Sequence, residues 1–394
     1  MEIRATESTD PGPDAVTLEV YRHLFTALAE EMGASLKRAS FSPNIKERRD
    51  YSCALFNPEG VAVALGDHMP VHLGAMPMSV EAALTEVGEL APGDVVILND
   101  PFKGGTHLPD ITLISALFSA DKAESYGADR SEGQGGEIGD ELSQPPGGNQ
   151  AEDREGGRIQ APGEGQGVLL GFVASRAHHS DVGGMSPGSM PLAQDIFQEG
   201  LPIPTVRLYE KGIRTEELWD TILANVRPPL ERAGDLDAQL AALHTGETRL
   251  LEMVDRKGPT EVLAAMRGLI DYADRLVEAG IQEIPDGRYL AEDFMDDDGF
   301  GSGPLPIRLA MEVIGDRMIL DFEGTAPHTR GGINAVAAIT SSATRYVVRC
   351  RVDALLETPL PAGGGSMSAV EMRLPPGSLV NASPPASVAA GNVE

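Results

Sequence analysis

Two stretches of sequence decide the fold: residues 94–118, DVVILNDPFKGGTHLPDITLISALF, and residues 168–184, VLLGFVASRAHHSDVGG. Both combine short apolar runs with loops that contain Gly, Pro, Asp and His. Apolar runs of this length, rich in β-branched residues and bounded by turn residues, are typical of buried strands. The sequence therefore predicts three strands, at 94–98, 111–118 and 168–174.

The last two of these strands can form an antiparallel hairpin, with the long segment between them as its loop. In such a pair the start of one strand lies beside the end of the other. The pairing places Asp110 near His178, with His107 just upstream. Two imidazoles and one carboxylate with open coordination positions suit Mn(II), Fe(II) or Zn(II). We therefore expect a divalent metal site at these three residues; the alternative is a set of polar loop residues that cap strand ends.

Other polar residues near these loops are candidates for the same pocket. His179 and Asp181 follow the second strand directly, and we expect them to be catalytic groups that move a proton. Asp67, His68 and His72 form a second segment that contains histidine. We expect this segment to bind substrate, although histidines in such a segment are more often structural.

The remaining patterns predict an α+β fold, with a mixed, largely antiparallel β-sheet core, flanking helices and a β-rich C-terminal region. Alternating apolar residues between 307 and 322, interrupted by Gly315 and Asp316, predict a hairpin in that C-terminal region. Asp14 can cap the first helix. Helical periodicity predicts helices at about 15–37, 79–90, 216–225, 235–256 and 260–279.

A change in composition divides the chain. Residues 131–166 are mostly Gly, Glu, Asp, Gln and Pro with few apolar residues, so they cannot bury enough surface to offset the entropy of ordering. We therefore expect a disordered, acidic, Gly-rich insertion at 120–167. The flanking segments are expected to be the N-terminal part of the sheet core with the first metal-ligand loop (1–119), the rest of the core with the second metal-ligand loop and a helical segment (168–285), and the β-rich region (286–394).

The composition also excludes some partners. A net charge of -29 over 394 residues repels phosphate groups, so neither nucleic acid nor an anionic membrane is an expected partner. The two cysteines, Cys53 and Cys350, are far apart, which indicates reduced thiols and not a disulfide scaffold. The sequence has neither the apolar core of a signal peptide nor an apolar run long enough to span a bilayer. We expect a cytoplasmic protein.

Several separate motifs follow one another along the chain. They are NDP at 99–101, GGTHLPD at 104–110, AHHSDVGG at 177–184, EGL at 199–201, NVR at 225–227, DF at 321–322 with GT at 324–325, and AGNVE at 390–394. In this order they resemble the hydantoinase B family, and the resemblance covers nearly the whole chain except the insertion. This family includes the B subunits of N-methylhydantoinase and 5-oxoprolinase and the corresponding subunit of acetone carboxylase.

The resemblance implies a hetero-oligomer with an A-type partner subunit, which binds ATP and phosphorylates the carbonyl oxygen of a small-molecule substrate. The B-type subunit then completes the reaction, and in the carboxylase relatives it carries a Mn-type metal site. Carried over to this sequence, that site would be His107, Asp110 and His178. Asp181 would orient one of the ligand histidines.

The activity that the resemblance implies is that of a hydrolase acting on the C–N bond of a cyclic amide, with 5-oxoproline or a hydantoin as substrate. Two alternatives remain open. One is a subunit of a ketone carboxylase, similar to acetone carboxylase. The other is a truncated, non-catalytic scaffold subunit, because family members normally continue past the AGNVE segment and this chain looks cut short.

Overall fold

The two strands on either side of the expected insertion pair with each other at the centre of a large sheet. In the computed structural model, β4 (Asp110–Phe118) and β5 (Leu169–His178) are antiparallel, and Asp110 lies directly opposite His178. The structure describes residues 13–66, 69–119, 167–356, 359–361 and 363–391. The expected insertion therefore falls almost entirely outside the described residues.

The central pair belongs to a seven-stranded sheet in which every neighbouring pair is antiparallel. Its strand order is β2-β1-β5-β4-β3-β6-β7. β1, β2 and β3 are buried along their whole length, so both faces of this sheet are covered. The other strands are β1 (Tyr51–Phe56), β2 (Ala62–Leu65), β3 (Val95–Leu98), β6 (Val206–Glu210) and β7 (Ile213–Arg214).

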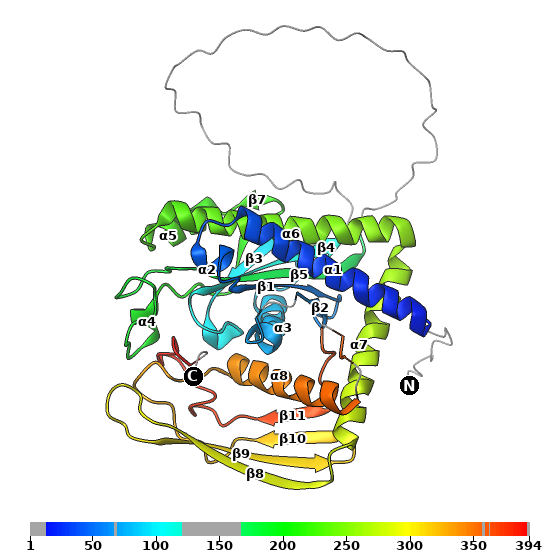
Figure 1. The fold of residues 1–394 in the computed structure, drawn as a ribbon. Coiled ribbons are helices and arrows are strands. Elements are labelled where there is room, and N and C mark those ends of the chain that lie inside the picture. The colour runs from blue at the N-terminus through cyan, green and yellow to red at the C-terminus, as the bar shows by residue number, and fades with distance from the viewer. Residues whose placement is uncertain (1–12, 67–68, 120–166, 357–358, 362, 392–394) are drawn as a thin grey trace, which may run out of the picture.

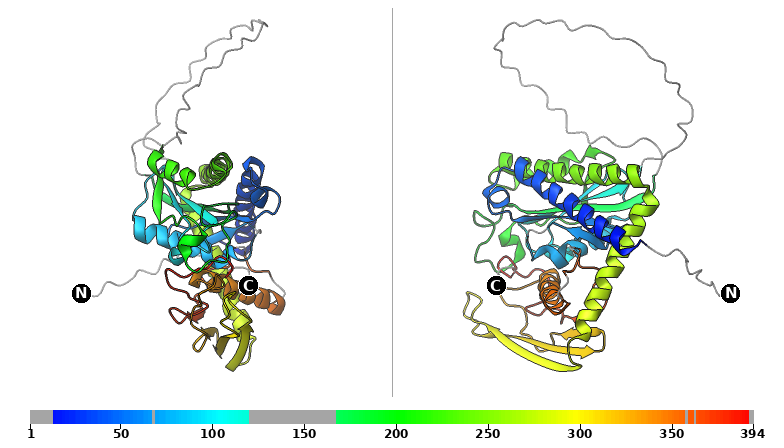
Figure 2. Two further views of the ribbon diagram at one scale, coloured as in Figure 1. Left: turned by 90° about the vertical axis from the view of Figure 1, so that its left-hand side faces the viewer. Right: turned by 45° about the vertical axis from the view of Figure 1, so that its right-hand side comes forward.

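Helices cover the two faces of the sheet (Figures 1 and 2). The buried side chains on each face form a separate hydrophobic cluster. α1 (Ala15–Ala39) and α6 (Pro229–Lys257) pack on one face, where alternate strand residues such as Leu55 join their cluster. α3 (His72–Ala82) covers the other face, where Phe56 points. The alternation of side chains along a strand produces this division.

A second sheet of four strands lies on the far side of α3 (Figure 1). It contains β8 (Gly287–Met295), β9 (Leu305–Ile314), β10 (Arg317–Asp321) and β11 (Val370–Arg373). β10 and β11 are parallel, whereas the other neighbours in this sheet are antiparallel. The sheet packs its apolar side chains against α7 (Pro259–Gln282) and α8 (Ala337–Leu356).

α8 also contacts α3 and so joins the two parts of the molecule. The Ser342 hydroxyl accepts hydrogen bonds from the amides of Gly74 and Ala75, at 2.9 and 3.1 Å. A Cβ atom added to Gly74 would lie 2.5 Å from the Ser342 nitrogen, so only glycine permits this close approach of the two helices.

The remaining short elements connect the larger ones. They are α2 (Pro43–Lys46), the π-helical turn η1 (Ala83–Val87), the 3-10 turn η2 (Pro101–Lys103), α4 (Ile196–Glu199) and α5 (Glu216–Ala224).

The α+β class with a largely antiparallel core is confirmed. Two details of the predicted helices were wrong. α3 begins at His72 and not near residue 79, although Pro77 lies inside it. α8 was not predicted at all, because its apolar residues do not gather on one helical face. No helix among the described residues is long and apolar enough to cross a membrane.

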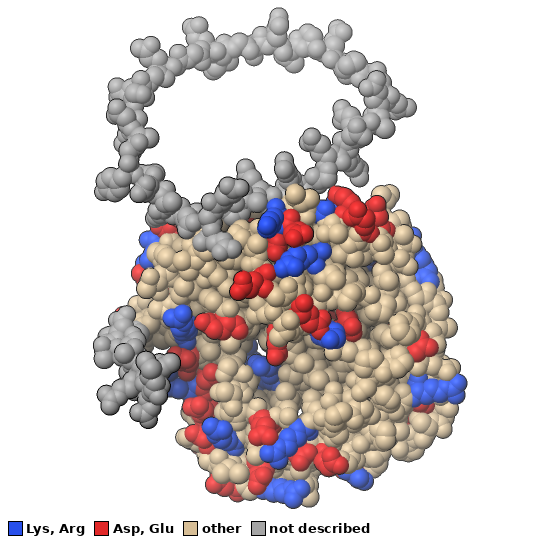
Figure 3. Space-filling model, turned by 180° about the vertical axis from the view of Figure 1, so that it is seen from behind, with Lys and Arg blue, Asp and Glu red and all other residues tan. Residues whose placement is uncertain are grey.

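The molecular face in Figure 3 shows acidic and basic side chains interspersed around broad uncharged areas. The acidic side chains are therefore not gathered into one patch on that face. On the second sheet, ion pairs join acidic and basic side chains, for example Arg308 with Glu292 and Arg373 with Glu371.

Candidate metal centre

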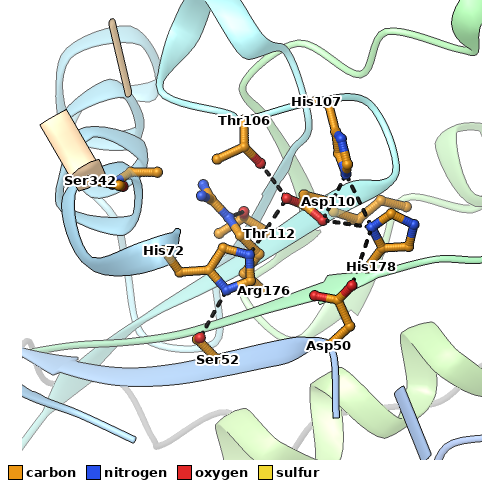
Figure 4. A network of polar contacts seen from close by, with 12 residues as sticks. Asp50, Ser52, His72, Thr106, His107, Asp110, Thr112, Arg176, His178 and Ser342 are labelled. Atoms are coloured by element: carbon orange, nitrogen blue, oxygen red, sulfur yellow. Dashed lines mark hydrogen bonds and ion pairs between the residues drawn. The ribbon is translucent and has the colours of Figure 1, made fainter. Parts of the chain in front are cut away.

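Three side chains meet at the edge of the large sheet where β4 begins and β5 ends (Figure 4). Asp110 and His178 are opposite each other in the strand register. His107 comes from the loop before β4, which Asn99 holds in place by donating to the Leu108 carbonyl at 2.8 Å. Gly104 turns this loop with a φ of 88°, in the left-handed region that favours glycine. The sequence-based pairing argument therefore places the three residues as the structure has them.

The three side chains present their ligand atoms to one point. His107 Nε2 and His178 Nδ1 are 3.1 Å apart, and they lie 3.2 and 3.3 Å from Asp110 Oδ1. Two ligands at about 2.1 Å from one ion are about 3.0 Å apart at a right angle and about 3.4 Å apart at a tetrahedral angle. The triangle thus has the size required for three neighbouring ligands of a single first-row metal ion, and the three residues form a candidate metal site.

The hydrogen-bond partners of His107 and Asp110 leave the atoms that face the centre free to bind a metal ion. The Ala389 carbonyl lies 3.2 Å from His107 Nδ1; since a carbonyl only accepts, Nδ1 carries the proton and the lone pair is on Nε2. The Thr106 hydroxyl donates to Asp110 Oδ2. Asp110 Oδ1 is buried and has no hydrogen-bond partner among the described residues. This donor set fits a divalent cation.

His72 extends the cluster from the first turn of α3. Its Nδ1 is 2.8 Å from the Ser52 hydroxyl, and its Nε2 is 3.5 Å from Asp110 Oδ2. His72 therefore contacts the far oxygen of the candidate ligand carboxylate and lies behind the three ligands. Asp67 and His68, the other residues of its predicted segment, lie outside the described residues.

Asp50 was missed by the sequence reasoning. Its Oδ2 lies 3.6 Å from His178 Nδ1, because β1 pairs with β5 and brings Tyr51 opposite Ala177. Asp50 and His178 are 25% and 13% exposed, whereas Asp110 is 2% exposed. The centre therefore opens to solvent on the Asp50 side. Only the β1–β5 pairing, which links segments more than 100 residues apart, could have revealed this residue.

Burial and the neighbouring charges raise the pKa of some groups at the centre and lower the pKa of others. Burial alone would raise the pKa of Asp110, but the charge of His107 and the close contacts with the neighbouring histidines hold it well below the usual range. Burial alone would lower the pKa of His107, and Asp110 outweighs that effect and raises it. Burial lowers the pKa of His72 despite Asp110. Burial and the charge of Asp110 together raise the pKa of Asp50.

A buried arginine lies beside the centre, below Asp110 in Figure 4. Arg176 is fully buried, and burial lowers its pKa to about 10. It donates from Nε to the Thr112 hydroxyl at 2.8 Å and from Nη2 to the Ser79 hydroxyl at 2.6 Å. Arg176 thereby ties β5 to β4 and α3 next to the candidate ligands.

His179 and Asp181, expected to be catalytic, point to other partners. His179 is fully buried, its Nε2 lies 2.8 Å from the Gln239 side-chain oxygen, and burial lowers its pKa to about 4. The Asp181 carboxylate accepts a hydrogen bond from Arg227 Nη1 at 2.7 Å. Neither side chain contacts one of the three candidate ligands through a hydrogen bond that the structure records among the described residues.

A cavity of about 420 Å³ lies elsewhere, against α3 and α8. Its lining includes Gly74, Met78, Ser341 and Arg345, and none of the candidate metal ligands. Since the polar groups that converge on one point are at the sheet edge, we place the functional centre there and not in this cavity.

Comparison with known proteins identifies the family. The chain matches the family described as Hydantoinase B/oxoprolinase over residues 14–133 and 159–394. It is 34% identical to 5-oxoprolinase 1 of Arabidopsis thaliana, over 96% of this chain and 28% of that protein. Its fold is similar to that of an ATP-dependent caprolactamase from Pseudomonas jessenii, with a TM-score of 0.77 and 28% identity over 95% of this chain and 57% of that chain.

A second solved structure shares the fold. Acetone carboxylase superposes with a TM-score of 0.72 at 18% identity, over 96% of this chain and 46% of that chain. The chain therefore spans from about a quarter to somewhat over half of the length of these proteins. With matches that cover most of its length, the chain belongs to the Hydantoinase B/oxoprolinase family.

Proposed function

We propose that this chain carries the metal-dependent hydrolytic centre of an ATP-dependent enzyme that opens cyclic amides, with 5-oxoproline or a hydantoin as substrate. The observation that carries the proposal is the triangle of His107 Nε2, Asp110 Oδ1 and His178 Nδ1, with sides of 3.1 to 3.3 Å. This geometry supports one divalent cation, Mn(II), Fe(II) or Zn(II), with coordination positions left for substrate and water.

A cation bound there would supply Lewis-acid chemistry, polarising a substrate oxygen and lowering the pKa of water. The protein side chains divide the remaining tasks. Thr106 donates to Asp110 Oδ2 and His72 lies beside that oxygen, so that Oδ1 stays directed at the centre. Asp50, at the solvent side, is positioned to accept a hydrogen bond from an attacking water and orient it.

The relatives support the substrate class that we propose. An amide carbonyl is a poor electrophile, and phosphorylation of its oxygen would make it a good one. The names of two similar proteins, 5-oxoprolinase and ATP-dependent caprolactamase, refer to lactams. We therefore assign ATP binding and phosphorylation to an A-type partner, supplied as a separate subunit or as another part of a longer protein, and hydrolysis to this chain. We propose no proton transfer by His179 or Asp181, since both have other partners.

The metal proposal is tested by elemental analysis of the purified chain. We expect about one equivalent of Mn, Fe or Zn in the parent, and its loss from a His107→Ala, His178→Ala double variant. His244→Ala is the matched control, because this histidine is 74% exposed on α6. A parent that binds no metal after reconstitution would refute the centre.

The hydrolase proposal is tested by adding an A-type partner, ATP and 5-oxoproline. Formation of glutamate, lost in the double variant, supports ring opening. ATP turnover that depends on acetone and bicarbonate would instead support carboxylation, as in acetone carboxylase, for which the likeness at 18% identity shows the fold alone. Assembly with the partner but no turnover in either assay would identify a non-catalytic scaffold.

A further inference from the structure

One of the three candidate ligands is oriented by a segment almost 300 residues further along the chain. His107 is 1% exposed, and its Nδ1 donates to the Ala389 carbonyl at 3.2 Å. This hydrogen bond determines which imidazole nitrogen faces the centre. The orientation of the Ala389 peptide therefore controls the direction of the His107 lone pair.

A buried carboxylate holds the main chain directly before the Ala389 carbonyl. Glu199, at the end of α4, is fully buried. Its Oε1 accepts hydrogen bonds from the Val388 amide at 2.8 Å and from the Ala389 amide at 3.0 Å. The Ser387 hydroxyl donates to the same oxygen. Three donors from three consecutive residues converge on one atom, which fixes the path of the main chain through 387–389.

Two further hydrogen bonds hold the same segment. Asn334 Nδ2 donates to the Ser387 carbonyl at 2.8 Å, and the Ala390 amide donates to the Gly332 carbonyl at 2.9 Å. A Cβ atom on Gly332 would lie 2.9 Å from the Ser387 hydroxyl oxygen. Asn334 and Gly332 therefore also hold the segment, but among the described residues only Glu199 accepts a hydrogen bond from the amide of Ala389.

We propose that Glu199 is a positioning residue for the metal centre, acting through the 387–389 segment and the Ala389 carbonyl on the orientation of His107. The inference rests on the proposed metal centre and adds to it a residue that touches none of the three ligands through a recorded hydrogen bond. Without Glu199, the Val388 and Ala389 amides lose their common acceptor, so the main chain before the Ala389 carbonyl can shift and carry this carbonyl away from His107. Partners of this indirect kind typically change metal affinity by about 10- to 100-fold.

The test compares Glu199→Ala and Glu199→Gln with the parent. Two quantities are measured on the whole chain: the dissociation constant for Mn(II), and the visible absorption of the Co(II)-loaded protein, which reports the ligand field at the metal. Neither readout requires turnover. Gln keeps an oxygen that can accept from both amides, whereas Ala keeps none. We expect Glu199→Ala to weaken Mn(II) binding by about tenfold or more and to change the Co(II) spectrum, and Glu199→Gln to remain close to the parent.

Asp274 provides a matched control at another place in the fold. Its carboxylate accepts from the Ser366 amide, the Ser366 hydroxyl and the Met367 amide, at 2.9, 2.7 and 3.1 Å. This arrangement of a carboxylate on a serine-containing loop is the same as at Glu199, but it contacts no candidate ligand. Asp274→Ala should therefore lower the stability of the fold and leave the Co(II) spectrum and the Mn(II) affinity at parental values.

Each outcome decides the inference. Parental affinity and spectrum in Glu199→Ala would overturn it, as would an equal loss of metal binding in Asp274→Ala, which would indicate a general loss of structure. If Glu199→Ala does not fold, Glu199→Asp is measured instead; it keeps the charge but withdraws the oxygens by one methylene, and unchanged binding would overturn the inference. A parent that binds no metal refutes the proposed centre itself and is thereby distinguished from a failure of Glu199 alone.

Discussion

Replacing Asp181 by asparagine distinguishes a structural role for this residue from the catalytic role that its position after β5 suggested. The carboxylate receives four hydrogen bonds: from the amides of Gly183, Gly188 and Arg227 at 3.0, 3.2 and 3.3 Å, and from Arg227 Nη1 at 2.7 Å. Together they close the loop that follows His178. Asn retains one acceptor oxygen and replaces the other with a donor, which faces the donors of Gly188 and Arg227.

The expected cost follows from those two lost contacts. A hydrogen bond to a charged group contributes about 1.5–3 kcal/mol and a neutral one about 1 kcal/mol. Arg227 is 40% exposed, so its ion pair contributes toward the lower end because solvent screens it. We expect Asp181→Asn to lower the free energy of unfolding by about 2–3 kcal/mol. The exposed Asp220→Asn, the control, should change it by less than about 0.5 kcal/mol.

The effect should also depend on pH in one direction. Burial alone would raise the pKa of Asp181, but the hydrogen bonds from Gly183 and Arg227 outweigh it and hold the pKa below its usual value. A carboxyl whose folded pKa is depressed stabilises the fold above its unfolded pKa of about 3.9 and loses that contribution as the pH falls through the folded pKa. The difference between parent and variant should therefore be full at pH 7 and shrink below about pH 4.

Urea denaturation followed by circular dichroism, repeated between pH 7 and pH 3, measures both effects. A variant with the parental midpoint at pH 7 would refute the structural reasoning. If that variant had also lost turnover in the reconstituted enzyme, Asp181 would instead act in the reaction, as its place in the sequence suggested.

Three further predictions concern the metal, the helix contact and the thiols. Divalent metal at about 100 times its dissociation constant should stabilise the parent against unfolding by about 2.7 kcal/mol. Thermal unfolding of Asp110→Asn should show no such stabilisation by the metal. An equal stabilisation of the variant would place the metal elsewhere. Gly74→Ala, which forces a Cβ to 2.5 Å from the Ser342 nitrogen, should destabilise the fold by about 1–3 kcal/mol, measured by urea denaturation; a parental midpoint would contradict this packing. Burial raises the pKa of Cys53 to about 12, whereas Cys350 is exposed. A thiol reagent at pH 8 should therefore label one cysteine per folded chain and two in denaturant. Rapid labelling of both cysteines in the folded chain would show that Cys53 is accessible.

Local sequence predicted three neighbouring strands of the large sheet, β3, β4 and β5, and the cap of its first covering helix. Asp14 caps α1 by accepting from the amides of Val16 and Thr17, as its residue type and place suggested. The β4–β5 hairpin could also be predicted, because the two strands flank one segment and the start of one strand then lies near the end of the other. That pairing brings Asp110 opposite His178, so the three candidate ligands could be named before the structure was known.

Other parts of the centre depend on contacts between distant segments. Asp50 reaches His178 only through the pairing of β1 with β5. His72 reaches Asp110 because α3 begins seven residues earlier than its periodicity indicated. Helical periodicity did not predict α8. Both α3 and the second sheet bury parts of the surface of this helix, so its apolar residues need not form a single stripe.

The sequence by itself determined the class of the fold, the central strand pair and the three residues whose chemistry suits a divalent metal. These depend on composition, alternation and neighbouring positions, which are local properties. Only the tertiary structure decided which atom of each ligand faces the centre, because that depends on partners remote in sequence: the Ala389 carbonyl for His107, and His72 for the far oxygen of Asp110. Polar contacts of this kind form between segments that packing brings together, and no local pattern along the chain records them.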